Sequence, residues 1–221
     1  MRRHLVVAID GPAATGKGTL AAGLAREMQL VHRETGRLYR AVGLSLLEGG
    51  LDPRSSADAG QCARHLDERL LADPRLDTEN VARAGSLAAV HAEVRAALLA
   101  LQRAWCNEVP EGFRGVVLEG RDIGSVVCPD ADVKLYLFAD LAVRARRRLA
   151  QFGANSEVGE VAEQLEERDR RDLAQPGAQR PDSPDVHVID TTWLDADAVL
   201  QVALGVVASL WPEGGYDGSG R

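Results

Sequence analysis

The stretch from Leu5 to Thr19, LVVAIDGPAATGKGT, limits the possible folds of this 221-residue chain more than any other. The apolar run from Leu5 to Ile9 predicts a short buried strand, and the segment from Thr19 to Ala25 predicts the helix that follows it. Between them lies Gly-x-x-x-x-Gly-Lys, a turn whose glycines let successive backbone N–H groups converge on one point. The helix N-terminus adds positive charge there, and the Lys17 ammonium can reach the outer phosphates of a nucleotide. This loop therefore predicts a nucleoside triphosphate site.

We assign the whole loop to the nucleotide, with Lys17 also as a catalytic residue: Gly11, Pro12, Ala13, Ala14, Thr15, Gly16, Lys17, Gly18 and Thr19. The residue after Lys17 is Gly18, so the hydroxyl comes one place later, at Thr19. GKGT is typical of small kinases of the adenylate-kinase type rather than of Ras-like switches. We expect Mg²⁺ with the ATP and assign no residue as its ligand. Thr19 could contact the ion directly or through water, because Mg²⁺ keeps several waters in such sites.

The composition excludes several classes of protein. Hydrophobic residues make up 45% of the chain and charged residues 27%, as in a globular enzyme, and no apolar run approaches a membrane span. The formal net charge of −7 argues against non-specific nucleic-acid binding. The first residues lead straight into the loop, which argues against a cleaved signal peptide. Three scattered cysteines, Cys62, Cys106 and Cys128, without a CxxC pair, predict reduced thiols and a cytoplasmic protein.

Three more apolar segments predict strands: 116–118, 133–138 and 186–190. Helical segments follow the last two, over 141–152 and 195–210. Strands that alternate with helices predict an α/β fold with a central parallel sheet covered on both faces. Ligands of such sheets bind at the carboxyl ends of the strands. Polar side chains fall at those ends in this chain: Asp10, Glu119, Arg121, Asp122 and Asp190.

We predict a single domain over residues 1–212, with a core of 1–50 and 114–212. Residues 51–113 break the alternation with Asp-Pro turns and a strong helix, and they predict an insertion rather than a second domain. A charged helical segment covers about 151–172. Residues 213–221, GGYDGSGR with the preceding glutamate, predict a flexible tail.

Arginines recur at the predicted turns and helices around this sheet. They occur in TGRLYR from Thr35, in EGRD from Glu119, and in ERDRRD from Glu167. Phosphoryl transfer requires mainly positioning and the neutralisation of charge on phosphate oxygens, which converging arginines supply. These arginines therefore favour a phosphotransferase over a protein that only binds the nucleotide.

Taken together and in this order, GPAATGKGT, TGRLYRAVG, VRAALLALQR, EGRDIGSVVCPDADVKLYL and ERDRRD resemble the bacterial cytidylate kinase family over about residues 4–210. The resemblance implies the three-layer P-loop fold of the nucleoside monophosphate kinases. In that fold, residues 51–113 form an inserted NMP-binding region and residues 151–172 a mobile helical lid. It also implies transfer of the γ-phosphoryl group of ATP to CMP or dCMP in pyrimidine nucleotide metabolism.

The resemblance also implies roles for individual residues, with Lys17, Arg121 and Arg168 as the catalytic set. Two residues match positions that hold the acceptor phosphate: Arg40 and Arg121. Three match positions that read the cytosine ring: Ser86, Arg95 and Asp122. Three match positions around the sugar and the transferred group, where Arg168 arrives with lid closure: Thr35, Arg168 and Asp172.

The chain departs from the family pattern at several positions. Arg33 and Glu34 stand before the TG, where the family has leucine and aspartate, and Glu119 takes the place of an aspartate. Three residues after Asp172 the family has an arginine that contacts the base, and this chain has Gln175. Either the base loses that charged contact, or Arg180, from the same loop, replaces it.

One arginine run is ambiguous in the sequence, because its members lie on several sides of one helix: Arg144, Arg146, Arg147 and Arg148. We expect one of them to face ATP and the others to be solvated. The rival hypotheses for the whole chain are another small P-loop kinase, with UMP, AMP or shikimate as acceptor, and a degenerate nucleotide-binding module. We expect a monomer that binds neither nucleic acid nor a membrane.

Overall fold

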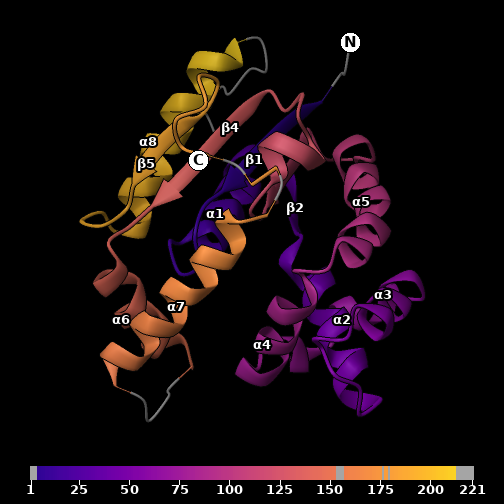
Figure 1. Ribbon diagram of the computed structural model, residues 1–221. Helices are drawn as coiled ribbons and strands as arrows, with labels where there is room; N and C mark the ends of the chain where they lie inside the picture. The colour runs from indigo at the N-terminus through magenta and orange to yellow at the C-terminus, as the bar shows by residue number, and fades with distance from the viewer. Residues whose placement is uncertain (1–3, 153–156, 176, 179, 213–221) are drawn as a thin grey trace.

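A five-stranded parallel sheet forms the centre of the molecule. The structure is a computed structural model that describes residues 4–152, 157–175, 177–178 and 180–212 (Figure 1). The strand order is β2-β3-β1-β4-β5. The strands are β1 (Leu5–Asp10), β2 (Leu30–Glu34), β3 (Gly115–Glu119), β4 (Val133–Phe138) and β5 (His187–Asp190). Every pair is parallel. The α/β fold with a central parallel sheet is therefore confirmed.

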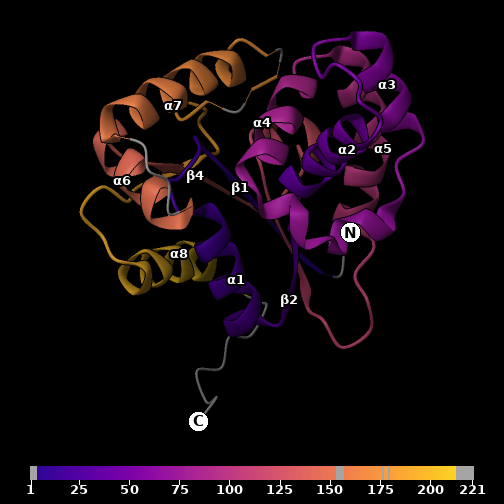
Figure 2. The ribbon, with the colours of Figure 1, turned by 90° about the horizontal axis from the view of Figure 1, so that it is seen from below.

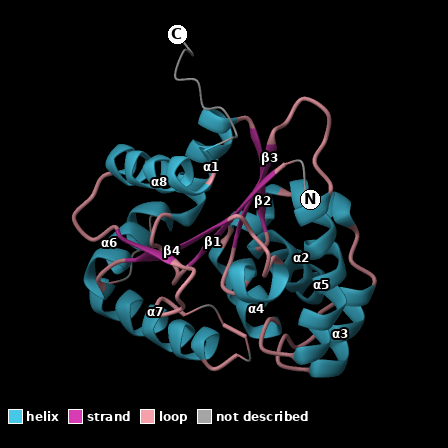
Figure 3. Ribbon diagram, turned by 90° about the horizontal axis from the view of Figure 1, so that it is seen from above, coloured by secondary structure: helices cyan, strands magenta, loops and turns pink. Residues whose placement is uncertain are grey.

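Helices cover both faces of the sheet, as buried strands with alternating connections require. Successive residues of β1 point to opposite faces, and all six are buried. On one face, Val7 and Ile9 pack against α1 (Lys17–Met28) and α8 (Ala196–Leu210). On the other, Val6 and Ala8 share a cluster with residues of α2 (Gly36–Glu48), α3 (Ser56–Arg64) and α5 (Ala92–Asn107). Figure 3 shows the two helical layers on either side of the strands.

Between β2 and β3 the described residues form helices and 3-10 turns joined by loops, without a strand. After α2 and α3 come two 3-10 turns, η1 (Glu68–Ala72) and η2 (Pro74–Asp77), and then α4 (Glu79–Ala88) and α5. The predicted strong helix corresponds to α5, whereas α4 was not predicted. α4 packs closely on α2, because Gly43 and Gly85 face each other and a Cβ on either would meet backbone of the other helix. This contact brings the two helices together beside the sheet.

Two further helices, α6 (Leu141–Phe152) and α7 (Val158–Leu173), lie opposite α4 across the carboxyl ends of the strands (Figure 2). They pack on each other through a small cluster that includes Ala145, Val161, Leu165 and Ala13 of the glycine-rich loop. A π-turn, η3 (Ile123–Val127), follows β3. The predicted tail over 213–221 and four residues of the segment 151–172 lie outside the described residues.

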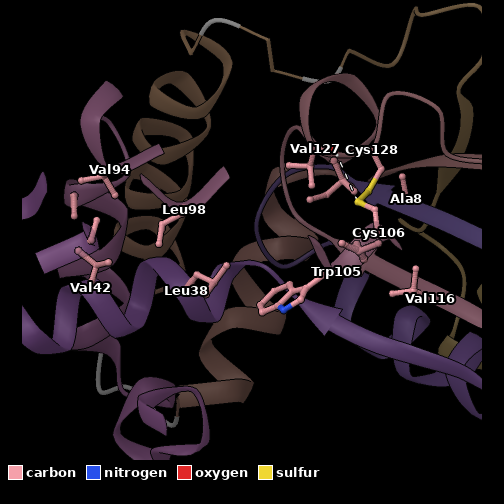
Figure 4. Packing of buried hydrophobic residues seen from close by; sticks show 14 of the residues in the cluster. Ala8, Leu38, Val42, Val94, Leu98, Trp105, Cys106, Val116, Val127 and Cys128 are labelled. Carbon is pink, nitrogen blue, oxygen red and sulfur yellow. Dashed lines mark hydrogen bonds between the residues drawn. A yellow bond between two sulfur atoms is a disulfide. The ribbon is translucent and has the colours of Figure 1, made fainter. Parts of the chain in front are cut away.

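The expectation of three reduced thiols is wrong for two of them. Cys106 at the end of α5 and Cys128 after η3 form a disulfide, with Cα atoms 6.3 Å apart (Figure 4). Tertiary packing places them together although 22 residues separate them, a spacing that carries no local signal in the sequence. Cys62 has a free thiol.

Among the described residues, no single helix is long and apolar enough to cross a membrane. Helices α4 and α5 taken together pass a test of length and composition alone, and they are bent by 103° at the break between them.

Candidate active site

A cavity of about 870 Å³ opens where the strands end at their carboxyl termini. It is lined by the loop after β1, the ends of β2 and β3, and residues after β5. All the residues predicted to bind the acceptor line it: Thr35, Arg40, Ser86, Arg95, Arg121, Asp122, Arg168 and Asp172. Of the predicted nucleotide loop, Ala13 to Thr19 line it, whereas Gly11 and Pro12 do not. The structure therefore brings the two predicted groups of residues into one cavity.

The loop after β1 has the backbone that its glycines predict. Gly11 has φ of 135°, and a Cβ there would collide with the carbonyl of Leu137 in β4. Gly16 and Ala14 also have positive φ values, 94° and 61°. Gly11 is therefore needed for the close approach of the loop to β4.

Lys17 is folded back on the loop in this structure. Its Nζ donates to the carbonyl of Pro12 at 2.7 Å, and the residue is 8% exposed. Burial lowers the pKa of the Lys17 ammonium well below its usual range, and the neighbouring Arg121 guanidinium lowers it further. A buried cation beside another cation is stabilised when an anion binds next to it. Lys17 is therefore well placed to bind a phosphate group.

Asp10 is a functional-site residue whose role the sequence did not indicate beyond its place at a strand end. Its two carboxylate oxygens accept the N–H groups of Ile123 and Gly124, each at 2.8 Å. Burial raises the pKa of this carboxyl to about 6, although the two hydrogen bonds oppose the shift. Asp10 thus ties the end of β1 to the turn after Arg121 and Asp122, and it holds that turn against the loop.

Three arginines from separate elements face the cavity with acidic partners. Arg121 Nε donates to Asp172 at 2.7 Å, and Arg168 lies 3.9 Å from the same carboxylate. The Nε of Arg168 is buried without a hydrogen-bond partner. Burial lowers the pKa of Arg168 to about 10, and Arg121 contributes to the shift. Arg40 pairs with Glu34 at 3.0 Å, so the glutamate that departs from the family pattern provides a partner for Arg40.

The structure separates the arginines of α6 that the sequence left ambiguous. Arg144 is buried and structural, since it bonds Asp169 at 2.6 Å and the carbonyls of Ala139 and Ala13. Arg146 is exposed and does not line the cavity. Arg147 lines the cavity and bonds the carbonyl of Thr191 at 2.6 Å, which fixes the segment after β5.

Arg148 is the member of that run that joins the other arginines. It lines the cavity, and burial lowers its pKa, with Arg40 contributing to the shift in the same direction. The helical spacing of α6 tells which of these arginines share a face of the helix. Only the packing of α6 on α7 shows which face points into the cavity. The sequence therefore could not single out Arg148.

The residues predicted to bind the sugar and the base line the same cavity, although the hydroxyl of Thr35 already has a partner. Thr35 lines the cavity, yet its hydroxyl donates to the carbonyl of Glu119 at 2.7 Å and joins the ends of β2 and β3. Ser86, half-buried on α4, and Arg95 on α5 both line the cavity. Burial raises the pKa of Asp122, whereas Arg95 lowers it. Ser86, Arg95 and Asp122 therefore form a polar group that can accept and donate hydrogen bonds.

Several other residues that line the cavity were not predicted as binding residues. Glu119 accepts from His32 at 2.9 Å and lies beside Gly18 of the loop. Tyr39 also faces the cavity, and burial raises its pKa to about 12. At the other end, the lining continues through Thr191, Leu194 and neighbouring residues of α8. The place of Glu119 at a strand end was the signal in the sequence, whereas nothing local distinguished His32.

The family model for cytidylate kinase matches residues 7–209. The chain is 43% identical to the cytidylate kinase of Rhodospirillum rubrum, over 92% of this chain and 97% of that protein. It is 45% identical to that of Paramagnetospirillum magneticum, over 92% and 98% of the two chains. It is 44% identical to that of Granulibacter bethesdensis, over 95% and 99%.

Solved structures with a similar fold are more distant in sequence. A gluconokinase from Sinorhizobium meliloti gives a TM-score of 0.54 at 13% identity, over 96% of this chain and 97% of that one. A thymidylate kinase from Candida albicans gives 0.50 at 13% identity, over 96% and 93%. At such identities they indicate the fold alone. The family match and the curated relatives, which cover nearly the whole chain, place this protein in the cytidylate kinase family.

Proposed function

We propose that this protein transfers the γ-phosphoryl group of ATP to CMP and dCMP, forming ADP and the corresponding nucleoside diphosphate. The observation that carries the proposal is the convergence of Lys17, Arg121, Arg148 and Arg168 on one cavity, from the loop, the end of β3, α6 and α7. Four cations from four elements can offset much of the negative charge on the phosphates of the two nucleotides.

In this reaction an oxygen of the acceptor phosphate attacks the γ-phosphorus of ATP, the new P–O bond forms, and the bond to the β-phosphate oxygen breaks. The loop from Ala13 to Thr19 cradles the phosphates of ATP through its backbone N–H groups and Lys17. Lys17 leaves the carbonyl of Pro12 for the phosphates when ATP binds. Arg121 and Arg168 neutralise the charge on the transferred group, and Asp172 holds Arg121 in line.

Arg40 and Arg121 bind the phosphate of the acceptor, while Ser86, Arg95 and Asp122 bind its cytosine ring. Thr35 supports the acceptor side indirectly, because its hydroxyl donates to the carbonyl of Glu119 and joins the ends of β2 and β3. Catalysis by positioning requires the acceptor and ATP to lie on opposite sides of the arginines. The lining of the cavity supports this arrangement, since it includes Ser86 and Arg95 from the helices between β2 and β3 as well as Thr191 and Leu194 after β5.

Mg²⁺ fits the oxygen donors beside the loop, because this ion prefers few protein ligands together with waters and substrate phosphates. The Thr19 hydroxyl and the Glu119 carboxylate, which lies against Gly18, would hold it. When bound, it would supply positive charge to the β- and γ-phosphate oxygens. Among the described residues there is no cluster of three or more His, Cys, Asp or Glu suited to a metal.

In this proposal each region of the chain has a role in binding or catalysis. Residues 1–212 form one domain, with 51–113 as the NMP-binding region and 151–172 as the lid. Arg168 on α7 reaches the transferred group as this lid closes. That the protein is a monomer and acts in the cytoplasm stays a prediction.

Phosphorus NMR of a mixture of the protein, ATP, Mg²⁺ and CMP tests the reaction. We expect resonances of ADP and CDP to grow in equal amounts while inorganic phosphate stays at background. Growth of ADP with inorganic phosphate alone would show hydrolysis, and no change with nucleotide bound would show a binding module; either result would contradict the proposal.

A further inference from the structure

The second residue after α7, Gln175, makes a contact across the cavity that the family pattern does not predict. Its side-chain oxygen accepts a hydrogen bond from Nη1 of Arg95 on α5. Its side-chain nitrogen donates to the carbonyl of Arg171, in the last turn of α7, at 3.3 Å. The orientation of the amide is fixed by chemistry, because a guanidinium has only donors and a carbonyl has only acceptors.

The loop that carries Gln175 is itself attached to the core. The hydroxyl of Ser125 in η3 donates to the carbonyl of Gly177 at 2.5 Å. Gly177 has φ of 84°, and a Cβ there would meet the side chain of Val126. The backbone near Gln175 is therefore held against η3 independently of its side chain. This attachment places the amide where it can reach Arg95.

Arg95 needs such a partner, because its other contacts are weak. Its Nη1 donates to the carbonyls of Ala89 and Val90, both at 3.3 Å, in the turn between α4 and α5. Its charge also acts on Asp122. A long side chain held only by two marginal hydrogen bonds retains much of its rotamer freedom, and an acceptor on the opposite side removes that freedom.

We propose that Gln175 is a positioning residue that orients the Arg95 guanidinium towards the base of the acceptor, beside Ser86 and Asp122. The proposal rests on the proposed function and adds that a hydrogen-bond acceptor without positive charge is needed at position 175. An arginine there, as in the family pattern, would place two guanidinium groups together in this chain, and they would repel each other. Arg180 does not substitute for it, since it is exposed and does not line the cavity.

Three substitutions distinguish orientation of Arg95 by Gln175 from a direct hydrogen bond between Gln175 and the base. Gln175→Met keeps the length but removes the acceptor, Gln175→Glu keeps the acceptor and removes the N–H donors, and Gln175→Arg restores the family residue. Gln164→Met, at an exposed glutamine within α7, is the matched control. The measurements are kcat and KM for CMP and UMP, KM for ATP, and the thermal unfolding midpoint.

For Gln175→Met we expect KM for CMP to rise about tenfold and the CMP/UMP ratio of kcat/KM to fall by a similar factor, the effect of losing a hydrogen bond to a charged group. Values of kcat, KM for ATP and the unfolding midpoint should match those of Gln164→Met. Gln175→Glu should stay within about threefold of the wild type. Gln175→Arg should resemble Gln175→Met.

A Gln175→Glu variant as impaired as Gln175→Met would overturn the proposal, because the amide N–H groups would then be the important ones. A higher CMP/UMP ratio in Gln175→Arg would do the same, as would a Gln175→Met variant like the wild type. NMR of the Arg95 guanidinium protons tests the hydrogen bond without turnover. Slower proton exchange in the wild type than in Gln175→Met supports the contact even if CMP is not phosphorylated, and equal exchange rates contradict it.

Discussion

Two buried ionisable residues, Lys17 and Asp10, show how single side chains determine this site. Lys17 lies in the cavity with its pKa lowered by burial, and Asp10 lies below it with its pKa raised by burial. The first residue is available to a ligand, since its one hydrogen bond to Pro12 can be exchanged. The second is committed to two backbone N–H groups. The two residues therefore call for different tests.

We expect Lys17→Met to lower kcat by about 10²–10³-fold, because the lost charge acts most strongly on the transition state. The unfolding midpoint should not fall, since the substitution removes a buried cation and keeps the length of the side chain. Arg146→Met is the control, as Arg146 is exposed on α6 and lies outside the cavity lining. Steady-state kinetics and thermal unfolding of both variants check this. Wild-type turnover in folded Lys17→Met would refute the role of the loop.

Asp10 predicts a pH dependence of stability. Its pKa is raised from 3.8 to about 6, so the folded state binds this proton more tightly than the unfolded state does. The stabilisation from this group is fully present below pH 3.8 and is lost as the pH rises through about 6. A shift of this size corresponds to about 3 kcal/mol. Denaturant unfolding of the wild type and of Asp10→Asn from pH 4 to 7 measures this contribution. The free energy of unfolding of the wild type minus that of Asp10→Asn should fall as the pH rises, because asparagine does not titrate. A difference in unfolding free energy that does not change with pH would contradict the raised pKa of Asp10.

Among the elements, α2 and α4 depend on each other through their glycines. Gly85 packs against the backbone of Tyr39 and Arg40, where a Cβ would lie 2.6 Å from the carbonyl oxygen of Tyr39. Ser86 follows it on the cavity side, so a displaced α4 would move Ser86 away from the acceptor. From the proposed role of Ser86 we infer that this contact affects binding of the acceptor as well as stability.

We expect Gly85→Ala to lower the free energy of unfolding by about 1–3 kcal/mol, the usual cost of overpacking, and to raise KM for the acceptor. Gly205→Ala in α8 is the matched control. Nothing lies within 4 Å of its Cβ position, so it should gain about 0.5–1 kcal/mol from the better helix propensity of alanine. Chemical denaturation of both variants gives the two values. Equal effects at the two positions would show that the close packing of α2 on α4 is unimportant.

The disulfide between Cys106 and Cys128 joins α5 to the turn that follows Asp122. We expect one titratable thiol, Cys62, in the unfolded and unreduced protein, and three after reduction. Since the bond closes a loop of 22 residues, reduction should cost about 3 kcal/mol of stability in the chain-entropy model. Thiol titration and denaturation with and without reductant check this, and Cys62→Ser should then titrate no thiol before reduction. Three thiols without reductant would contradict the disulfide.

At the scale of the whole molecule, the strands and the glycine-rich loop could be predicted because their signals are local. The run from Val133 to Phe138 is the observed β4, and the loop after β1 has its predicted conformation. Other features depend on tertiary contacts that no local pattern encodes. These include α4, the inward face of Arg148, the hydrogen bond from Arg95 to Gln175, and the pairing of Cys106 with Cys128. The sequence therefore indicated which residues line the cavity, but it did not indicate the tertiary contacts that hold their side chains in place.

If the site has the proposed specificity, it phosphorylates cytidine monophosphates in preference to other acceptors. This preference is measured as kcat/KM with ATP and Mg²⁺ for CMP, dCMP, UMP and AMP. We expect CMP and dCMP to exceed UMP and AMP by tenfold or more, because Ser86, Arg95 and Asp122 present both donors and acceptors to the base. Equal values for all four acceptors, or a preference for AMP or UMP, would contradict the account.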